Sequence, residues 1–213
     1  MASAQTSPAV PRGTTVPRLG LRERKKIRTR QAIRRAAYRL FAEHGYDATP
    51  VDRIAEAADV SPSTVFRYFP TKEDIVLTDE YDEMLAAAVR ARPAGEPPLE
   101  SVHRAVLDVL GHIVEHDPAE LRQRTALVHE VPALRGRTAE CLAESGRALC
   151  AVLAGRTGRP ADDLELRVMV AAVLGALQET MMHWIERGRE GTEADLLPLA
   201  DRALRLLAGG LRL

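Results

Sequence analysis

Apolar residues recur at intervals of three and four along most of this chain, which is the spacing of one face of an α-helix. The first clear example lies within residues 21–44, where the stripe consists of Ile33, Ala36, Ala37, Leu40 and Phe41. The other faces of this predicted helix carry Arg30, Arg34, Arg35 and Arg39. Gly45 follows, as a residue that can take the left-handed conformation in which many helices end.

Two short helices are predicted next from their capping residues. The first spans about 49–58 with Thr49 as its N-cap, and the second spans about 61–69 with Ser61 as its N-cap. A proline follows each cap, as is common at the first helical position. The connection between the two helices is tight, and Asp59 within it tolerates a left-handed backbone better than most residues do.

The rest of the chain is also predicted to be helical. Residues 71–92 form one expected helix that ties the short helices to a larger body, since three short helices bury little surface alone. After a loop at 93–98, apolar stripes predict helices from Leu99 to Ile113 and at about 119–129, 132–153, 162–187 and 193–207. The sequence therefore predicts an all-α fold of about nine helices, with a head at 21–92 and a body at 98–213.

The two short helices and the tight connection between them form a helix-turn-helix pattern, in which the second helix enters the major groove of DNA. This second helix begins with the small polar residues Ser61, Ser63 and Thr64. Short side chains at that end let the backbone approach the base edges. The donors Arg67, Tyr68 and Lys72 follow, within reach of phosphates or bases.

The formal charge of the whole chain is zero, but it is unevenly distributed. Residues 1–39 contain eleven Lys and Arg and a single acid, so they carry +10 and the remainder carries −10. A basic end on an acidic body favours a polyanionic partner such as double-stranded DNA. Residues 1–20 are expected to be a disordered basic tail. The arm Arg22, Lys25, Lys26 and Arg28 either enters the adjacent minor groove or acts as a nonspecific electrostatic tether.

Residues 36–46 and 49–75 resemble the head of TetR-family (tetracycline-repressor-like) transcriptional regulators. The resemblance covers about 27–87, with the helix-turn-helix proper at about 50–69. It depends on Phe41, Gly45, Thr49, Ile54, Ala55, Val60, Ser61, Thr64, Tyr68, Phe69, Lys72 and Glu73. Two positions depart from the family pattern, because Asp59 replaces a glycine in the turn and Phe66 replaces a tyrosine. Phe66 cannot donate to a phosphate, and it either touches a thymine methyl or packs inward.

This resemblance implies a role for each residue of the head. Base contacts are expected from Ser61, Ser63, Thr64 and Arg67, and phosphate contacts from Tyr68, Lys72 and the region of Thr49. For Ser61 the alternative is a role as helix cap only, and for Lys72 it is an ordinary surface lysine.

The resemblance also implies a homodimer formed through helices 162–187 and 193–207, and a ligand cavity among the middle helices. Candidate lining residues are His103, His112, His116, Met169, Gln178, Met181, Met182 and Trp184, and the alternative for each is packing in the core or at the dimer contact. Residues 153–164 resemble a loop of actinobacterial members of this family, some of which bind acyl-CoA-like ligands. We therefore expect a repressor that a small apolar or acyl-type effector releases from a palindromic operator. The alternative is an activator or regulator without a small-molecule inducer.

Other classes of protein are disfavoured. The sequence contains no phosphate-binding loop, dinucleotide fingerprint or catalytic triad order, so we expect no enzyme, no catalytic residue and no cofactor. His112 and His116 lack a third metal ligand, so no metal site is expected. Cys141 and Cys150 would lie about 13.5 Å apart along one helix, too far for a disulfide. The strongly apolar run Val168–Leu177 is shorter than a membrane span of about 20 residues, and we expect a cytoplasmic protein without membrane contact.

Overall fold

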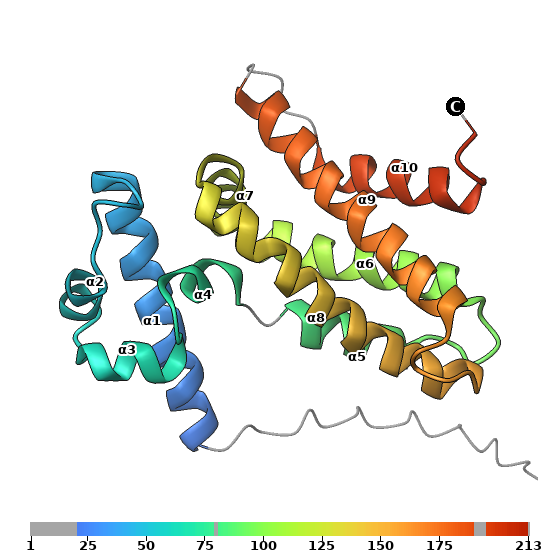
Figure 1. Ribbon diagram of the computed structural model, residues 1–213, viewed down its shortest axis with the longest axis horizontal. Helices are drawn as coiled ribbons and strands as arrows, with labels where there is room; N and C mark the ends of the chain where they lie inside the picture. The colour runs from blue at the N-terminus through green and yellow to red at the C-terminus, as the bar shows by residue number, and fades with distance from the viewer. Residues whose placement is uncertain (1–20, 79–80, 190–194, 213) are drawn as a thin grey trace, which may run out of the picture.

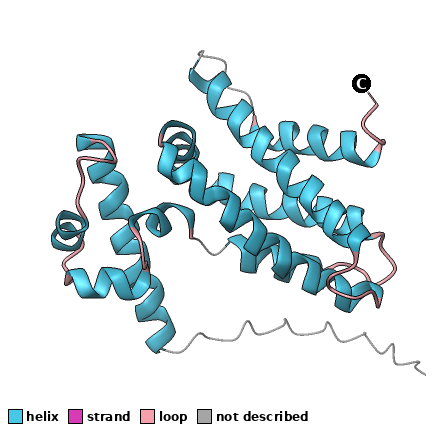
Figure 2. Ribbon diagram, viewed as in Figure 1, coloured by secondary structure: helices cyan, strands magenta, loops and turns pink. Residues whose placement is uncertain are grey.

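The computed structural model describes residues 21–78, 81–189 and 195–212, and every regular element within them is a helix (Figures 1 and 2). The all-α prediction is therefore confirmed. The helices are α1 (Leu21–His44), α2 (Val51–Ala57), α3 (Pro62–Tyr68), α4 (Lys72–Leu77), α5 (Tyr81–Ala91), α6 (Pro98–His116), α7 (Pro118–Glu130), α8 (Pro132–Thr157), α9 (Leu164–Arg189) and α10 (Leu196–Ala208). In Figure 1, α1–α3 form a group at one end and α5–α10 a larger group at the other, with α4 between them. The predicted tail at 1–20 lies outside the described residues.

The described residues contain ten helices rather than the nine expected, because the predicted helix at 71–92 is two helices, α4 and α5. Helix α4 ends at Leu77, and the backbone of the next residue, Thr78, is extended at φ −93 and ψ 117. In a continuous helix the carbonyls of Leu77 and Thr78 would accept from the next turn. Here Arg124 Nη2 donates to the Leu77 carbonyl at 3.2 Å and Arg34 Nη2 donates to the Thr78 carbonyl at 2.5 Å. Two arginines thus satisfy the carbonyls that the end of α4 exposes.

The local predictions for the head are largely confirmed. All five residues of the α1 stripe are buried, and Gly45 has φ 85 directly after the helix. Asp59 takes a left-handed conformation with φ 54 in the turn between α2 and α3. Ser61 caps α3, since its Oγ accepts from the backbone N–H of Thr64 at 3.2 Å.

The prediction for Thr49 is wrong. The N-cap of α2 is Pro50, and no side chain caps that helix. The Thr49 side chain is fully buried, and its Oγ1 donates to the carbonyls of Gly45 at 2.8 Å and Leu40 at 3.3 Å. Thr49 therefore closes the loop that follows α1 instead of starting α2.

The core of the head continues into the body. The apolar cluster that contains Val65 and the α1 stripe residues other than Ala36 also includes Ile75 and Val76 of α4, Val128 of α7 and Leu134 of α8. Arg34, expected on a polar face of α1, is only 6% exposed. It is buried where this shared cluster joins the head to the body, a region that we call the joint. There it forms an ion pair with Glu120 of α7 at 3.5 Å. A displacement of α4 would therefore disturb the packing of both the head and the body.

The body encloses a second apolar core, to which α5, α6, α7, α8, α9 and α10 all contribute. Helix α8 ends at Thr157, beyond the expected 153, because the left-handed residue is Gly158 with φ 71. Helices α9 and α10 begin and end within three residues of their predicted bounds.

Helix α9 is longer and more apolar overall than the run Val168–Leu177 indicated. By length and composition alone, Leu164–Gly188 could cross a membrane, and only 28% of its most apolar window is buried within the protomer. Leu164 and Val168 are 72% and 60% exposed. This helix therefore presents an apolar side that the described residues of the chain leave uncovered.

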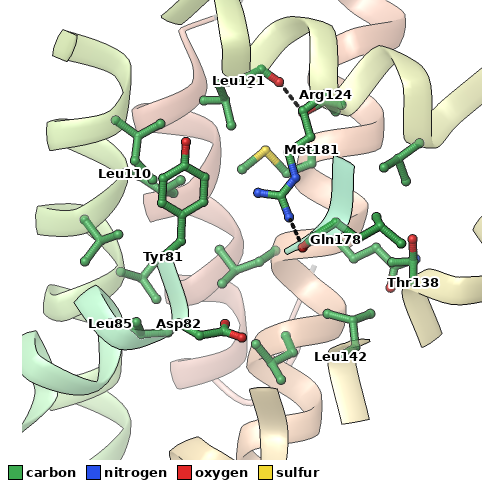
Figure 3. Close-up of a pocket in the computed structure, with 18 of the residues that line it drawn as sticks. Tyr81, Asp82, Leu85, Leu110, Leu121, Arg124, Thr138, Leu142, Gln178 and Met181 are labelled. Atoms are coloured by element: carbon green, nitrogen blue, oxygen red, sulfur yellow. Dashed lines mark hydrogen bonds between the residues drawn. The ribbon is translucent and has the colours of Figure 1, made fainter. Parts of the chain in front are cut away.

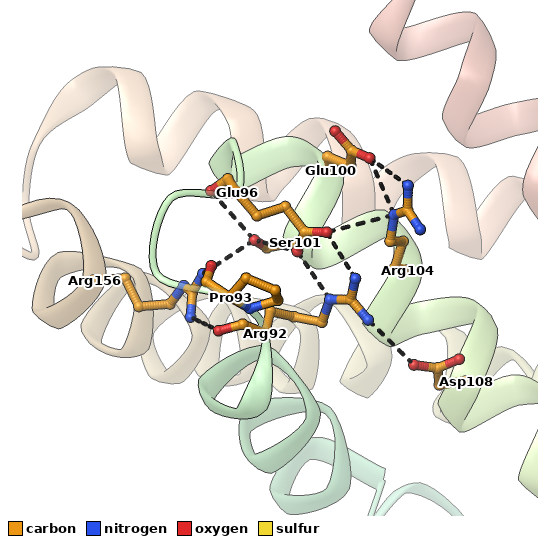
Figure 4. A network of polar contacts seen from close by, with 8 residues as sticks. All are labelled: Arg92, Pro93, Glu96, Glu100, Ser101, Arg104, Asp108 and Arg156. Atoms are coloured by element: carbon orange, nitrogen blue, oxygen red, sulfur yellow. Dashed lines mark hydrogen bonds and ion pairs between the residues drawn. The ribbon is translucent and has the colours of Figure 1, made fainter.

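A polar network fastens the far end of α5 to α6 and α8 (Figure 4). The Arg92 guanidinium donates two hydrogen bonds to the Glu96 carboxylate, at 2.7 and 2.8 Å, and the Ser101 hydroxyl donates to the same group at 2.9 Å. Arg156 of α8 donates to the backbone carbonyls of Arg92 at 2.8 Å and Pro93 at 2.7 Å. These contacts hold the turn between α5 and α6 in one position.

Candidate nucleic-acid interface and body cavity

Helix α3 is attached to the head by one buried side, which includes Val65, and is open on the other. Ser61, Ser63 and Arg67 are exposed, and Thr64 is half-buried. The Ser61 hydroxyl lies 2.9 Å from the hydroxyls of both Ser63 and Thr64, so three hydroxyl groups gather at the N-terminal end of the helix. A helix end of this kind offers short donors and acceptors to a groove.

Phe66 lies on the open side of α3. Its side chain is 49% exposed, so of the two alternatives for this residue the structure excludes inward packing. An exposed phenyl ring beside the hydroxyl cluster is suited to an apolar contact such as a thymine methyl.

A basic groove lies between the start of α1 and α3. It is lined by Arg22, Lys25, Lys26, Thr29, Val60, Thr64, Arg67 and Tyr68. Among the described residues that line it, four are cations and none is an acid. Arg28 is exposed on α1 but does not line this groove. A groove with this composition is suited to the phosphates that flank a site read by α3.

Lys72 has structural partners that the sequence did not indicate. Its Nζ donates to the carbonyls of Tyr46 at 2.8 Å and Thr49 at 3.3 Å, and lies 4.1 Å from the centre of the Tyr46 ring. The Tyr46 hydroxyl donates to the Glu73 carboxylate at 3.1 Å, and burial, followed by the nearby Glu73 charge, raises the pKa of Tyr46. Lys72 therefore fastens α4 to the loop after α1. Because Thr49 is buried in that loop, its side chain cannot reach a phosphate.

The body contains a mainly apolar cavity of about 250 Å³, bounded by residues of α4 to α9. Of the predicted lining residues, Gln178, Met181 and Met182 line it, and His103, His112, His116, Met169 and Trp184 do not.

The five residues outside the cavity have other surroundings. His103 Nε2 lies 2.9 Å from Asp201 Oδ1 and joins α6 to α10. The rings of His112 and His116 lie on an exposed side of α6, with centroids 4.0 Å apart and planes tilted by 33°. Met169 packs against the body core, and the Trp184 ring lies under the Arg122 guanidinium at 4.8 Å. In the part of the chain that the structure describes, no group of three or more His, Cys, Asp or Glu could hold a metal ion.

Sequence reasoning missed the polar residues of the cavity, which include Tyr81, Asp82 and Arg124 (Figure 3). Arg124 is the most informative, because it lies on the same face of α7 as Leu121, Thr125 and Val128. A charged residue within an apolar stripe was the signal available in the sequence. Burial lowers the pKa of Arg124, as expected for a cation removed from water, although an arginine stays protonated.

Two family models match this chain. Residues 33–78 match the model described as bacterial regulatory proteins of the tetR family, and residues 96–212 match the model of the MftR C-terminal domain. The first falls on the head and the second on nearly the whole body.

Individual proteins agree with these matches. The HTH-type transcriptional regulator TcmR of Streptomyces glaucescens is 37% identical over 184 residues, which cover 82% of this chain and 81% of TcmR. The fatty acid metabolism regulator protein of Bacillus subtilis is 25% identical over 187 residues, which cover 83% and 92%. The crystal structure of the TetR-family repressor FadR of Thermus thermophilus, in complex with lauroyl-CoA, superimposes with a TM-score of 0.55 at 26% identity, covering 86% of this chain and 95% of that one. This chain therefore belongs to the tetR family of bacterial regulatory proteins and is a DNA-binding transcriptional regulator.

Proposed function

We propose that this protein is a homodimeric repressor that leaves a palindromic operator when a small apolar or acyl-type ligand fills the body cavity. The observation that carries this proposal is the position of the cavity. Leu77 of α4 and Tyr81 of α5 line it, while Ile75 and Val76 of α4 are buried in the core of the head. A ligand that changes the position of α4 therefore changes the position of α3.

The exposed apolar side of α9 supports a dimer through α9 and α10. Leu164 and Val168 project from it, with the small residues Ala171 and Gly175 also exposed. A twofold partner would cover this side and place two α3 helices one DNA turn apart, about 34 Å, as a palindrome requires. A partner helix, rather than lipid, is the covering that fits a regulator whose target is DNA, and we assign the protein to the cytoplasm.

Two relatives support an apolar or acyl-type ligand. One is a regulator of fatty acid metabolism, and another was crystallised with lauroyl-CoA. An open cavity also favours a ligand-responsive regulator over the alternative of a regulator without an inducer, for which the body would be filled by its own side chains.

In the complex with DNA, we assign base contacts to Ser61, Ser63, Thr64, Phe66 and Arg67, which lie on or beside the open side of α3. We assign phosphate contacts to the groove residues Arg22, Lys25, Lys26 and Tyr68, with Arg28 adding charge on α1. Thr49 instead supports the loop between α1 and α2 from within the head, whereas to Lys72, which is half-buried and fastens the same loop, we also assign a phosphate contact.

The test begins with selection of an operator from random DNA by the full-length protein. A mobility-shift titration on that operator is then repeated with and without lauric acid and lauroyl-CoA. We expect a symmetric site and release of DNA by at least one of the two compounds. The variant Arg67→Ala should lose sequence preference while keeping nonspecific binding, because a base contact specifies and a phosphate contact does not.

The control is Arg90→Ala, which changes an exposed arginine in the last turn of α5, outside both the head and the proposed dimer helices. It should retain sequence preference. An operator that no occupant of the cavity releases would identify the alternative, a regulator without an inducer.

A further inference from the structure

The cavity combines an apolar lining with one deeply placed cation. Apart from Tyr81, Asp82, Arg124, Thr125, Thr138 and Gln178, the residues that line it are aliphatic or Met. The hydroxyls of Thr125 and Thr138 donate to carbonyls of their own helices, at 2.9 and 2.7 Å. Burial, the largest effect, raises the pKa of Tyr81 to about 12, so its phenol stays neutral. The charge in the cavity therefore comes from Arg124 and Asp82.

These two charged residues are not equivalent. Figure 3 shows the Arg124 guanidinium projecting toward the middle of the cavity, between Tyr81 and Gln178, while Asp82 lies at the opposite side. Asp82 is exposed, and its Oδ2 accepts a hydrogen bond of 2.6 Å from Ser145. The group that a ligand meets inside the cavity is therefore a guanidinium.

We propose that the ligand is an organic acid, and that Arg124 determines this specificity by binding the carboxylate of the ligand while the apolar lining holds its tail. This rests on the proposed function of the cavity as the ligand site, and it adds the chemical class of the ligand and the residue that selects it. A guanidinium presents several N–H groups in a planar fork that matches a carboxylate, and such a charge-assisted bond is stronger than a neutral one.

Arg124 also connects the ligand to α4. Its Nη2 donates to the Leu77 carbonyl at 3.2 Å, and its guanidinium lies 5.5 Å from the centre of the Tyr81 ring, so it touches both sides of the break between α4 and α5. A carboxylate in the cavity competes with that carbonyl for the guanidinium. Binding of an acid thus acts on the last turn of α4, which an uncharged ligand of the same shape would not do.

The experiment compares three probes of equal chain length, sodium octanoate, 1-octanol and octylamine, by calorimetry with the full-length protein at one ionic strength. We expect octanoate to bind at least about tenfold more tightly than octanol, and octylamine to bind most weakly. Arg124→Met should remove the preference for octanoate while leaving octanol binding within about threefold of the original. Arg122→Met, which removes an exposed arginine two residues away and outside this cavity, should change neither value.

The outcomes separate this inference from the function on which it rests. If octanol or octylamine binds as tightly as octanoate, or if folded Arg124→Met keeps the preference for the acid, the inference is wrong. Should Arg124→Met fail to fold, Arg124→Lys can replace it as a variant that retains the charge. The comparison of probes on the original protein still tests whether the cavity prefers an acid. Operator release by octanol equal to that by octanoate would refute the inference and leave the proposed function standing. Binding of no probe, with an operator that stays bound, would refute both.

Discussion

The joint between head and body can be tested by removing one side chain from it. Leu134 lies on α8, within the body, yet it is fully buried in the apolar cluster of the head. The change Leu134→Ala removes three carbon atoms from a site that neighbouring helices enclose. If the head and body share one core as described, the whole chain should lose stability, and not only the first turns of α8.

The expected loss is about 3 kcal/mol, within the range of roughly 2–5 kcal/mol found for fully buried Leu to Ala changes. For a chain of this length, 1 kcal/mol lowers the melting temperature by roughly 2–4 °C, so the variant should melt about 6–12 °C below the original. The conservative change Leu134→Met keeps the volume and should cost less than about 1.5 kcal/mol.

Urea unfolding measures the free energy and thermal unfolding the melting temperature, both followed by circular dichroism. All variants are compared at one protein concentration because a dimer is stabilised by mass action. A loss below about 1 kcal/mol for Leu134→Ala would refute the reasoning, since that is the size of effect expected from surface positions. Two separate unfolding transitions would also refute it, because they would show a head that unfolds independently of the body.

Three further predictions each concern a single residue. Lys26→Ala should weaken binding to all DNA sequences alike and lower the slope of log affinity against log salt by about one, measured by fluorescence anisotropy. Asp59→Gly should raise stability by roughly 0.5–1 kcal/mol in denaturant titration, because the backbone at φ 54 costs an L-residue more than glycine. Hydrogen bonds from Arg92 lower the pKa of Glu96 to about 2 in the folded protein, against about 4.3 when unfolded. The stability from this group is thus complete above pH 4.3 and is lost as the pH falls toward 2, a loss that Glu96→Gln should not show in acid unfolding curves.

Features that depend on neighbours in the sequence were predictable. The buried stripe of α1, the left-handed Asp59 and the cap formed by Ser61 each follow from residues within a few positions. The break after α4 was not predictable in this way. The guanidinium groups that donate to its exposed carbonyls belong to Arg34 and Arg124, which lie 44 and 47 residues away in the chain.

The same distinction between local and distant neighbours applies to the candidate site. The exposed residues of α3 were identified because a short capped helix has one side to present. Among the predicted cavity residues, Gln178, Met181 and Met182 line the cavity, whereas His112 and His116 lie on an exposed side of α6. Residue type alone indicated the histidines, and only the packing of α6 shows which of its sides faces inward. Arg124 was missed because burial of a charged side chain costs free energy, so the sequence alone offered no reason to place it inside the body. Only the structure shows the cavity that it faces.

The polar network at the junction of α5 and α6 determines the point about which α5 can tilt. Because Arg92, Glu96 and Arg156 hold one end of α5, a rigid movement of that helix is a rotation about this end (Figure 4). The opposite end, at Tyr81, lies about 16 Å away, at 1.5 Å for each residue. A tilt of about 10° would displace that end by about 3 Å. The displacement is therefore largest at the end of α5 that lies nearest the DNA-binding head.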